Sequence, residues 1–108
     1  MHDFRKLRVW AMARDLAVAI DRASRAFPPS DNGVVSSQLR RAVISIPANI
    51  AEGCGKSSRK ETLRYFQIAA GSAIEVENHL LLAGEFGYLP TQNRDELLEQ
   101  LKSIAKES

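Results

Sequence analysis

The segment Ser37–Gly53, SQLRRAVISIPANIAEG, decides the fold. Its apolar residues recur every three or four positions, which is the period of an α-helix. They cover nearly half of the helix circumference: Leu39, Val43, Ile46 and Ile50, extended by Ile44, Pro47 and Ala51. The polar residues share an arc of about 80°: Gln38, Arg41, Ser45, Asn49 and Glu52. The pattern predicts a largely buried helix over residues 34–51, and the interior Pro47 predicts a kink in it.

Three further helical patterns flank this segment. Residues 4–26 carry one apolar stripe and end before Pro28 and Pro29, since proline cannot continue a helix. Ser58 and Glu61 form a capping box that predicts a helix from there to Phe86, with Gly87 as its C-terminal cap. A fourth pattern covers residues 93–105, and its narrow apolar stripe predicts an outer position. Strand patterns are absent, so residues 1–108 are expected to form one all-α domain, an antiparallel up-down four-helix bundle.

The helix predicted over residues 58–86 has the same polar and apolar pattern as the helix predicted over residues 34–51. Its polar arc is again narrow, and one apolar face is covered by Tyr65, Phe66, Ala69, Ala73, Val76 and Leu80. A second set extends this face: Leu63, Ala70, Ile74 and Leu81. A peripheral helix of a small monomer needs only one stripe of about 100°. We therefore expect self-association, with these two central helices at the subunit interface.

Charge is distributed unevenly along the chain. The net charge is +2, with 15 Lys and Arg against 13 Asp and Glu. Residues 1–64 hold 12 of the basic and 6 of the acidic side chains, so the first part is basic and the remainder acidic. Three interpretations remain open: a mixed solvated surface, a phosphate-facing patch, or a complementary subunit contact.

Other sequence features concern location. No apolar stretch approaches the ~20 residues that span a bilayer. The first residues lack the apolar segment of a signal peptide. Cys54 is the only cysteine, which excludes an internal disulfide and suits a reducing cytoplasm. The expected location is therefore cytoplasmic.

The sequence offers little for catalysis, cofactors or metals, and we expect none of them. Gly53–Ser57 resembles the end of a phosphate-binding loop, but Ile50 occupies the position of its first glycine and a helix precedes it. His2, His79 and Cys54 are too few for a metal site. Ser45 and Ser72 have no evident base. Glu52 and Glu75 could face one another, although a salt-bridge network is the better interpretation of such carboxylates.

The polar arcs allow two interpretations. In the first, Arg40 and Arg41 pair with Glu52 or Glu75 inside an interior network that sets the register and the oligomeric state. Its members are Gln38, Arg41, Ser45, Asn49, Glu52, Ser72 and Glu75. In the second, the arginines form a nucleic-acid or partner surface together with a basic turn: Arg40, Arg41, Lys56, Arg59 and Lys60.

The motif Ser37–Gly53 also resembles a bacterial protein family, the four-helix-bundle proteins first associated with intervening sequences in 23S ribosomal RNA genes. Phe4–Trp10, Ala69–Glu75 and Gly87–Leu89 resemble it as well. The resemblance implies an up-down bundle assembled as a ring, as a homopentamer. The matching polar residues are Arg40, Arg41, Ser45, Asn49, Glu52, Ser72 and Glu75.

A similar fold occurs in the accessory proteins of diversity-generating retroelements, which bind reverse transcriptase and nucleic acid. The modest charge of this chain departs from those strongly basic proteins and weakens the nucleic-acid interpretation. The leading hypothesis is a non-catalytic oligomeric scaffold or binding module associated with RNA or DNA. The rival is an assembly protein whose partner is another polypeptide, such as a reverse transcriptase. A helical ribonuclease that uses Glu52 or Glu75 is the third hypothesis.

Overall fold

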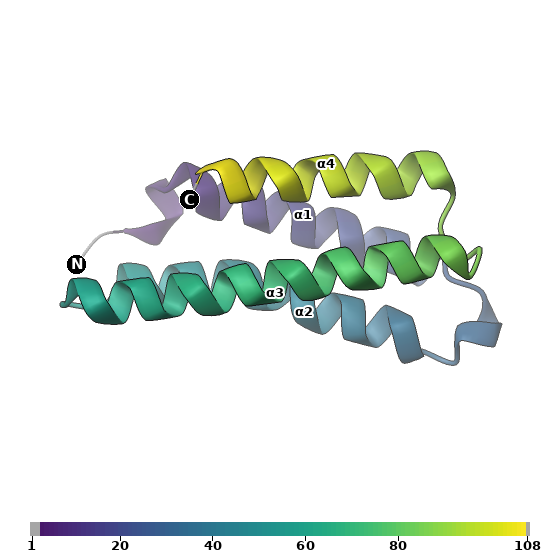
Figure 1. Cartoon of the computed structure of the whole chain (residues 1–108), viewed down its shortest axis with the longest axis horizontal. Coiled ribbons are helices and arrows are strands. Elements are labelled where there is room, and N and C mark those ends of the chain that lie inside the picture. The colour runs from purple at the N-terminus through teal and green to yellow at the C-terminus, as the bar shows by residue number, and fades with distance from the viewer. Residues whose placement is uncertain (1–2, 108) are drawn as a thin grey trace.

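The computed structural model describes residues 3–107, and the regular structure in this range is entirely helical. Four long helices run alongside one another in alternating directions, within overall dimensions of 45 × 22 × 18 Å (Figure 1). The predicted all-α four-helix bundle is confirmed. The elements are η1 (Phe4–Lys6), α1 (Arg8–Arg25), η2 (Pro29–Asp31), α2 (Val34–Cys54), α3 (Arg59–Glu85) and α4 (Thr91–Glu107). No helix within residues 3–107 is long and apolar enough to cross a membrane.

The core forms where the apolar stripes of the four helices meet. Its largest fully buried side chains come from α1, α2 and α3: Leu16, Ile20, Leu39, Val43, Ile46, Val76 and Leu80. α4 adds Leu97, Leu101 and Ile104, and it packs on α1 and α3 but not on α2. The outer position predicted for the last helix agrees with this arrangement. α2 and α3 share the most extensive contact in the bundle.

Several predicted helix boundaries shift in the structure. The first helix does not start at Phe4, because Leu7 is extended and separates the turn η1 from α1. α2 continues through Pro47 as one helix and reaches Cys54 instead of Ala51. α4 is longer than predicted at both ends, and its first turn closes with a hydrogen bond from the Arg94 N–H to the Pro90 carbonyl at 3.0 Å.

The predicted ends of α3 are confirmed by their hydrogen bonds. The Ser58 hydroxyl accepts the N–H of Glu61 at 3.2 Å, which caps the first turn. Gly87 adopts a left-handed conformation, with φ of 76°. The N–H of Tyr88 then reaches the carbonyl of Ala83 at 2.9 Å, and that of Gly87 reaches Gly84 at 3.1 Å. These two bonds satisfy carbonyls that the helix end would otherwise leave unpaired.

A buried carboxylate begins α2. Asp31 accepts the backbone N–H groups of Val35 at 2.9 Å and of Ser36 at 3.1 Å, and also the Ser36 hydroxyl at 2.8 Å. Burial alone would raise the pKa of Asp31. The three hydrogen bonds and the positive charge of Arg40 outweigh burial and hold this pKa below its usual range.

A close approach joins the end of α2 to the start of α3. The Thr62 hydroxyl donates to the Gly53 carbonyl at 2.9 Å. A Cβ atom on Gly53 would lie 3.0 Å from the Phe66 ring and 3.1 Å from the Thr62 carbonyl oxygen. Gly53 lies in the last turn of α2, and only hydrogen fits at this contact.

Replacing Asp31 with Ala should lower the free energy of unfolding by about 2 kcal/mol, since three donors lose their acceptor. Urea unfolding monitored by circular dichroism measures the change. Ser30→Ala, one residue earlier at an exposed position, serves as the control and should leave stability nearly unchanged.

The contribution of Asp31 to stability should depend on pH. The folded-state pKa is depressed, so the contribution is complete above the unfolded-state pKa of about 3.9. It is lost as the pH falls through the folded-state value. The stability difference between the wild type and Asp31→Asn should stay constant from pH 7 to about 5 and shrink below about 4. A difference that is the same at pH 3 and pH 7 would contradict this account.

Replacing Gly53 with Ala should destabilise the fold by about 1–3 kcal/mol, because the methyl group meets a ring and a carbonyl that are both held in place. Gly71→Ala is the matched control. Gly71 also lies inside a helix, but a Cβ atom there meets nothing within 4 Å. Alanine should stabilise that position by up to about 1 kcal/mol. Thermal unfolding of the two variants should therefore shift in opposite directions.

Candidate functional site

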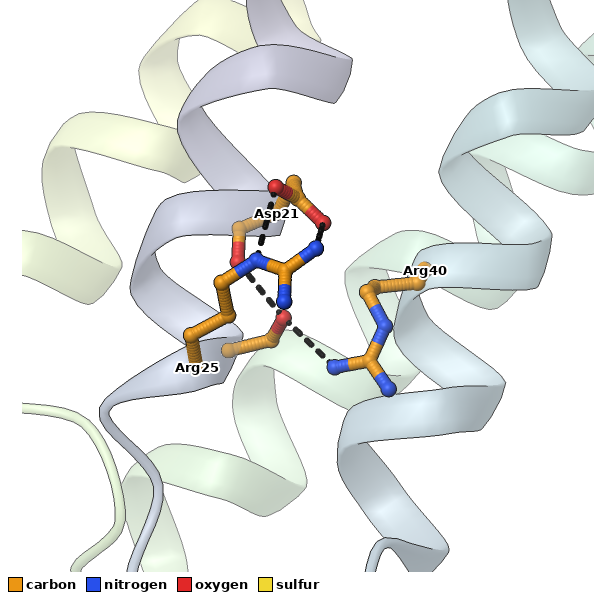
Figure 2. Close-up of polar contacts among 4 residues, drawn as sticks. Asp21, Arg25 and Arg40 are labelled. Atoms are coloured by element: carbon orange, nitrogen blue, oxygen red, sulfur yellow. Dashed lines mark hydrogen bonds and ion pairs between the residues drawn. The ribbon is translucent and has the colours of Figure 1, made fainter.

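Arg40 of α2 extends toward the end of α1. Its Nη1 donates to the Ser24 hydroxyl at 3.0 Å, and that hydroxyl donates to the Asp21 carbonyl at 2.9 Å. Figure 2 shows Arg40 approaching α1 where Arg25 and Asp21 form a two-bond ion pair, at 3.1 and 3.2 Å. Arg40 is half-buried and Ser24 is buried. Arg40 therefore links α1 to α2, and sequence spacing alone did not indicate its partner.

Arg41 points away from this contact, because successive residues of a helix differ by about 100°. Its side chain is exposed. The predicted pairing of Arg40 and Arg41 with Glu52 or Glu75 is wrong, since no such ion pair occurs among residues 3–107 within 4.0 Å. Glu52 instead lies 3.7 Å from the Lys56 ammonium.

Glu52 and Glu75 do not face one another. The contact between Ser45 and Ser72 fixes the level at which α2 and α3 meet. From there Glu52 is seven residues along α2 and Glu75 is three residues along α3, and these helices run in opposite directions. At 1.5 Å per residue, the two positions lie about 15 Å apart along the bundle. The carboxylate pair that a helical ribonuclease would need is not formed.

The interior polar network is smaller than predicted. The Ser45 and Ser72 hydroxyls lie 2.7 Å apart, and Asn49 donates its amide to the Ser45 hydroxyl at 2.9 Å and carbonyl at 2.8 Å. The other four predicted members have exposed side chains in the single chain, and so they do not belong to its interior: Gln38, Arg41, Glu52 and Glu75. These four residues lie at the border of the same polar arcs, on the side that faces solvent. Helical periodicity alone cannot distinguish a residue inside a helix–helix contact from one at the border of that contact.

The five predicted contact residues do not form one patch either. Arg40 and Lys56 are sixteen residues apart on and just after α2, which corresponds to about 24 Å along the bundle. Lys56, Arg59 and Lys60 do lie together, in the α2–α3 turn and the first turn of α3. Lys56 contacts the Tyr65 ring at 5.1 Å as well as Glu52, so it is partly engaged within the chain.

The topology gathers more basic residues around this turn. The two described ends of the chain and the start of α3 lie at the same end of the bundle (Figure 1). We define the basic end by the Lys and Arg side chains found there: Arg5, Lys6, Arg8, Lys56, Arg59, Lys60, Arg64 and Lys106. Four acidic residues accompany these eight: Asp3, Glu52, Glu61 and Glu107. The sequence pattern indicated only three of the eight as contact residues, namely Lys56, Arg59 and Lys60, although an even number of antiparallel helices brings these segments together.

Ion pairs neutralise only part of the basic end. Arg5 pairs with Asp3 at 3.0 Å, and Arg8 pairs with Glu107 at 3.4 Å. The Arg5–Asp3 contact raises the pKa of Arg5 and lowers that of Asp3, chiefly through their hydrogen bond. Five cations of the basic end form no ion pair with any residue of the range 3–107: Lys6, Arg59, Lys60, Arg64 and Lys106. This excess of positive charge makes the basic end suited to binding a polyanion.

The described residues hold few groups that could perform chemistry. No cluster of three His, Cys, Asp or Glu side chains within residues 3–107 is placed to hold a metal ion. Ser45 and Ser72 bond to each other, so neither faces a base. Cys54 is buried. His79 is half-buried on α3, one helical turn after the exposed Glu75.

The family match agrees with the resemblance seen in the sequence. No curated protein matches the chain. The family model described as 23S rRNA-intervening sequence protein matches residues 5–107, nearly the whole chain. With its four-helix bundle, this chain therefore belongs to the family of 23S rRNA-intervening sequence proteins.

Proposed function

We propose that the protein is a non-catalytic, oligomeric binding module of the cytoplasm that contacts the phosphates of RNA or DNA through the basic end. The surplus of unpaired cations at that end carries the proposal. Phosphate binding by Lys and Arg needs little shape complementarity, because it depends mainly on the release of condensed counterions. The association of the family with ribosomal RNA genes favours RNA as the partner.

The basic end combines cations from three segments. Arg59, Lys60 and Arg64 belong to the first turns of α3, Lys6 to η1 and Lys106 to the last turn of α4. Side chains from separate segments can contact several phosphates of one strand at once. Arg40 has another role in this proposal, since it is bonded to Ser24 inside the chain.

Assembly forms the second part of the proposal. Apolar side chains remain exposed on α2 and α3, among them Ile44 at 59% and Ile68 at 42%. Exposed apolar surface of this kind is typical of an interface. We propose that these contacts form a ring, the homopentamer that the family resemblance implies. A ring would repeat the basic end around its axis and strengthen polyanion binding through multivalency.

An alternative rests on the same exposed apolar residues. An assembly protein that recognises another polypeptide, such as a reverse transcriptase, would use these side chains and need no nucleic acid. Capture of such a partner after nuclease treatment, by a protein that shifts neither RNA nor DNA, would favour this alternative.

Nucleic-acid binding should depend on the unpaired cations of the basic end. The variant Lys6→Gln/Arg59→Gln should bind single-stranded RNA at least about tenfold more weakly at ~50 mM salt. The slope of log affinity against log salt should fall by roughly one for each lost phosphate contact. Fluorescence anisotropy over a salt series measures both.

Arg22→Gln/Arg41→Gln is the matched control, because it removes two exposed cations away from the basic end. It should bind RNA nearly as well as the wild type. Loss of binding only in this control would contradict the proposal and place the contact at Arg22 or Arg41 instead. A wild-type protein that binds neither RNA nor DNA at ~50 mM salt would contradict the proposal.

Native mass spectrometry at micromolar concentration should detect the ring, with a mass of five chains or a multiple of it. The mass should not change after nuclease treatment, since the apolar contacts are between protein chains. A monomer under these conditions would refute the assembly part of the proposal and leave the RNA measurement unaffected.

A further inference from the structure

One row of apolar residues on α3 remains largely exposed in the described part of the chain. It consists of Leu63, Ala70, Ile74 and Leu81, at spacings of seven, four and seven residues. Leu63 and Leu81 are five helical turns apart and so point in the same direction, and the other two deviate from them by about 20°. We call these four residues the α3 stripe. It follows one side of the helix for about 27 Å.

The α3 stripe lies on the solvent side of the helix. α3 uses other faces for the core, through Ser72, Val76 and Leu80. Leu63, Ile74 and Leu81 remain 46%, 67% and 45% exposed. Ala70 and Ile74 also border an apolar groove of about 620 Å³ between α3 and α4. Single exposed leucines are ordinary, but a continuous row beside a groove is typical of a docking surface.

The stripe reads the same in both directions. Its spacings are symmetric about position 72, so reversal of the helix exchanges Leu63 with Leu81 and Ala70 with Ile74. Against an antiparallel copy of itself, each leucine would meet a leucine, and each Ala70 would leave room for an Ile74. Large side chains opposite small ones are what close helix packing requires. A symmetric surface of this kind suits a twofold contact, in which the same patch serves both copies.

The charges beside the stripe select the same orientation. Lys60 and Glu85 are exposed, lie on the same flank of the stripe, and form no ion pair among residues 3–107. In the antiparallel arrangement, Lys60 of one copy lies within one residue of the level of Glu85 of the other, and the symmetry repeats this pair. Gln67 and Asn78 meet in the same way on that flank. A parallel arrangement would instead hold each Lys60 about 37 Å from the Glu85 of the other copy, so neither pair could form.

We propose that the α3 stripe is a self-recognition surface, by which two copies of the chain pair antiparallel about a twofold axis at the level of residue 72. From Lys60 to Glu85 the contact extends for about 37 Å, nearly the whole of α3. Neither the nucleic-acid binding nor the ring proposed above is needed for it. A twofold contact joins copies in pairs, so by itself it gives a dimer.

The apolar part of the contact can be tested with two isoleucines. Ile74→Glu should weaken pairing at least about tenfold, because the charge enters the centre of the stripe twice. Ile44→Glu is the matched control, since Ile44 is similarly exposed but lies on α2. Sedimentation velocity over a concentration series should show loss of the doubling in the first variant and its retention in the second. Retained doubling in Ile74→Glu would overturn the inference.

Charge exchange tests the antiparallel register. Lys60→Glu alone and Glu85→Lys alone should each weaken pairing by about tenfold at low salt, because both symmetric pairs become repulsive. An equimolar mixture of these two variants should pair again as a heterodimer, since one copy is then acidic at both positions and the other is basic at both. The double variant Lys60→Glu/Glu85→Lys should pair like the wild type.

These outcomes separate the stripe from the proposed ring. If the ring contact and the twofold contact both exist, the Ile74→Glu variant should form single rings with an odd number of chains. If only the stripe contact exists, the wild type is a dimer and Ile74→Glu a monomer, so the inference stands while the ring fails. An Ile74→Glu variant that takes a ring directly to monomers, or a mixture of Lys60→Glu and Glu85→Lys that does not pair, would refute the twofold contact.

Discussion

The close packing of α2 against α3 is the constraint on which the rest of the structure depends. It is possible only because small residues occupy the places where these helices meet. The Ser45 and Ser72 hydroxyls meet at 2.7 Å in the middle, and Gly53 leaves only a hydrogen atom toward Phe66 and Thr62 at one end. Two fixed points along the contact determine its register, and α1 and α4 then cover the inner sides of this pair. A hydroxyl pair also satisfies the polar groups that this approach buries.

The same packing explains why α2 and α3 appear too apolar for a small monomer. The small residues that let α2 and α3 approach each other occupy only a narrow arc of each helix. The core residues occupy the arc next to it. Since α1 and α4 cover only the inner sides of α2 and α3, the outer sides of both central helices stay uncovered. Ile44 and Ile74 lie on those sides, both well exposed. Their apolar character therefore cannot be attributed to the core of a single chain.

Periodicity in the sequence predicted the fold because burial repeats with the helix turn, and the caps at Ser58 and Gly87 are local signals. It did not predict the contacts between helices, because they depend on the axial register of one helix against another. Arg40 thus pairs with Ser24 of α1 and not with Glu52 or Glu75. For the same reason only Ser45, Asn49 and Ser72 of the seven proposed network residues are bonded together. The basic end could have been predicted, since bundle topology alone brings its segments together.

Charge and apolar surface are separated in this molecule, and the separation limits how the two proposed activities can combine. The unpaired cations gather at one end of the 45 Å bundle, whereas the α3 stripe runs along its side. An antiparallel pair through α3 would therefore present its two basic ends in opposite directions. A short nucleic acid could contact only one of them, whereas a long or folded one could bridge both. Pairing would engage Lys60 with Glu85 of the other copy and leave the other four unpaired cations of each end for a short strand. It would favour ligands long enough to reach from one end to the other.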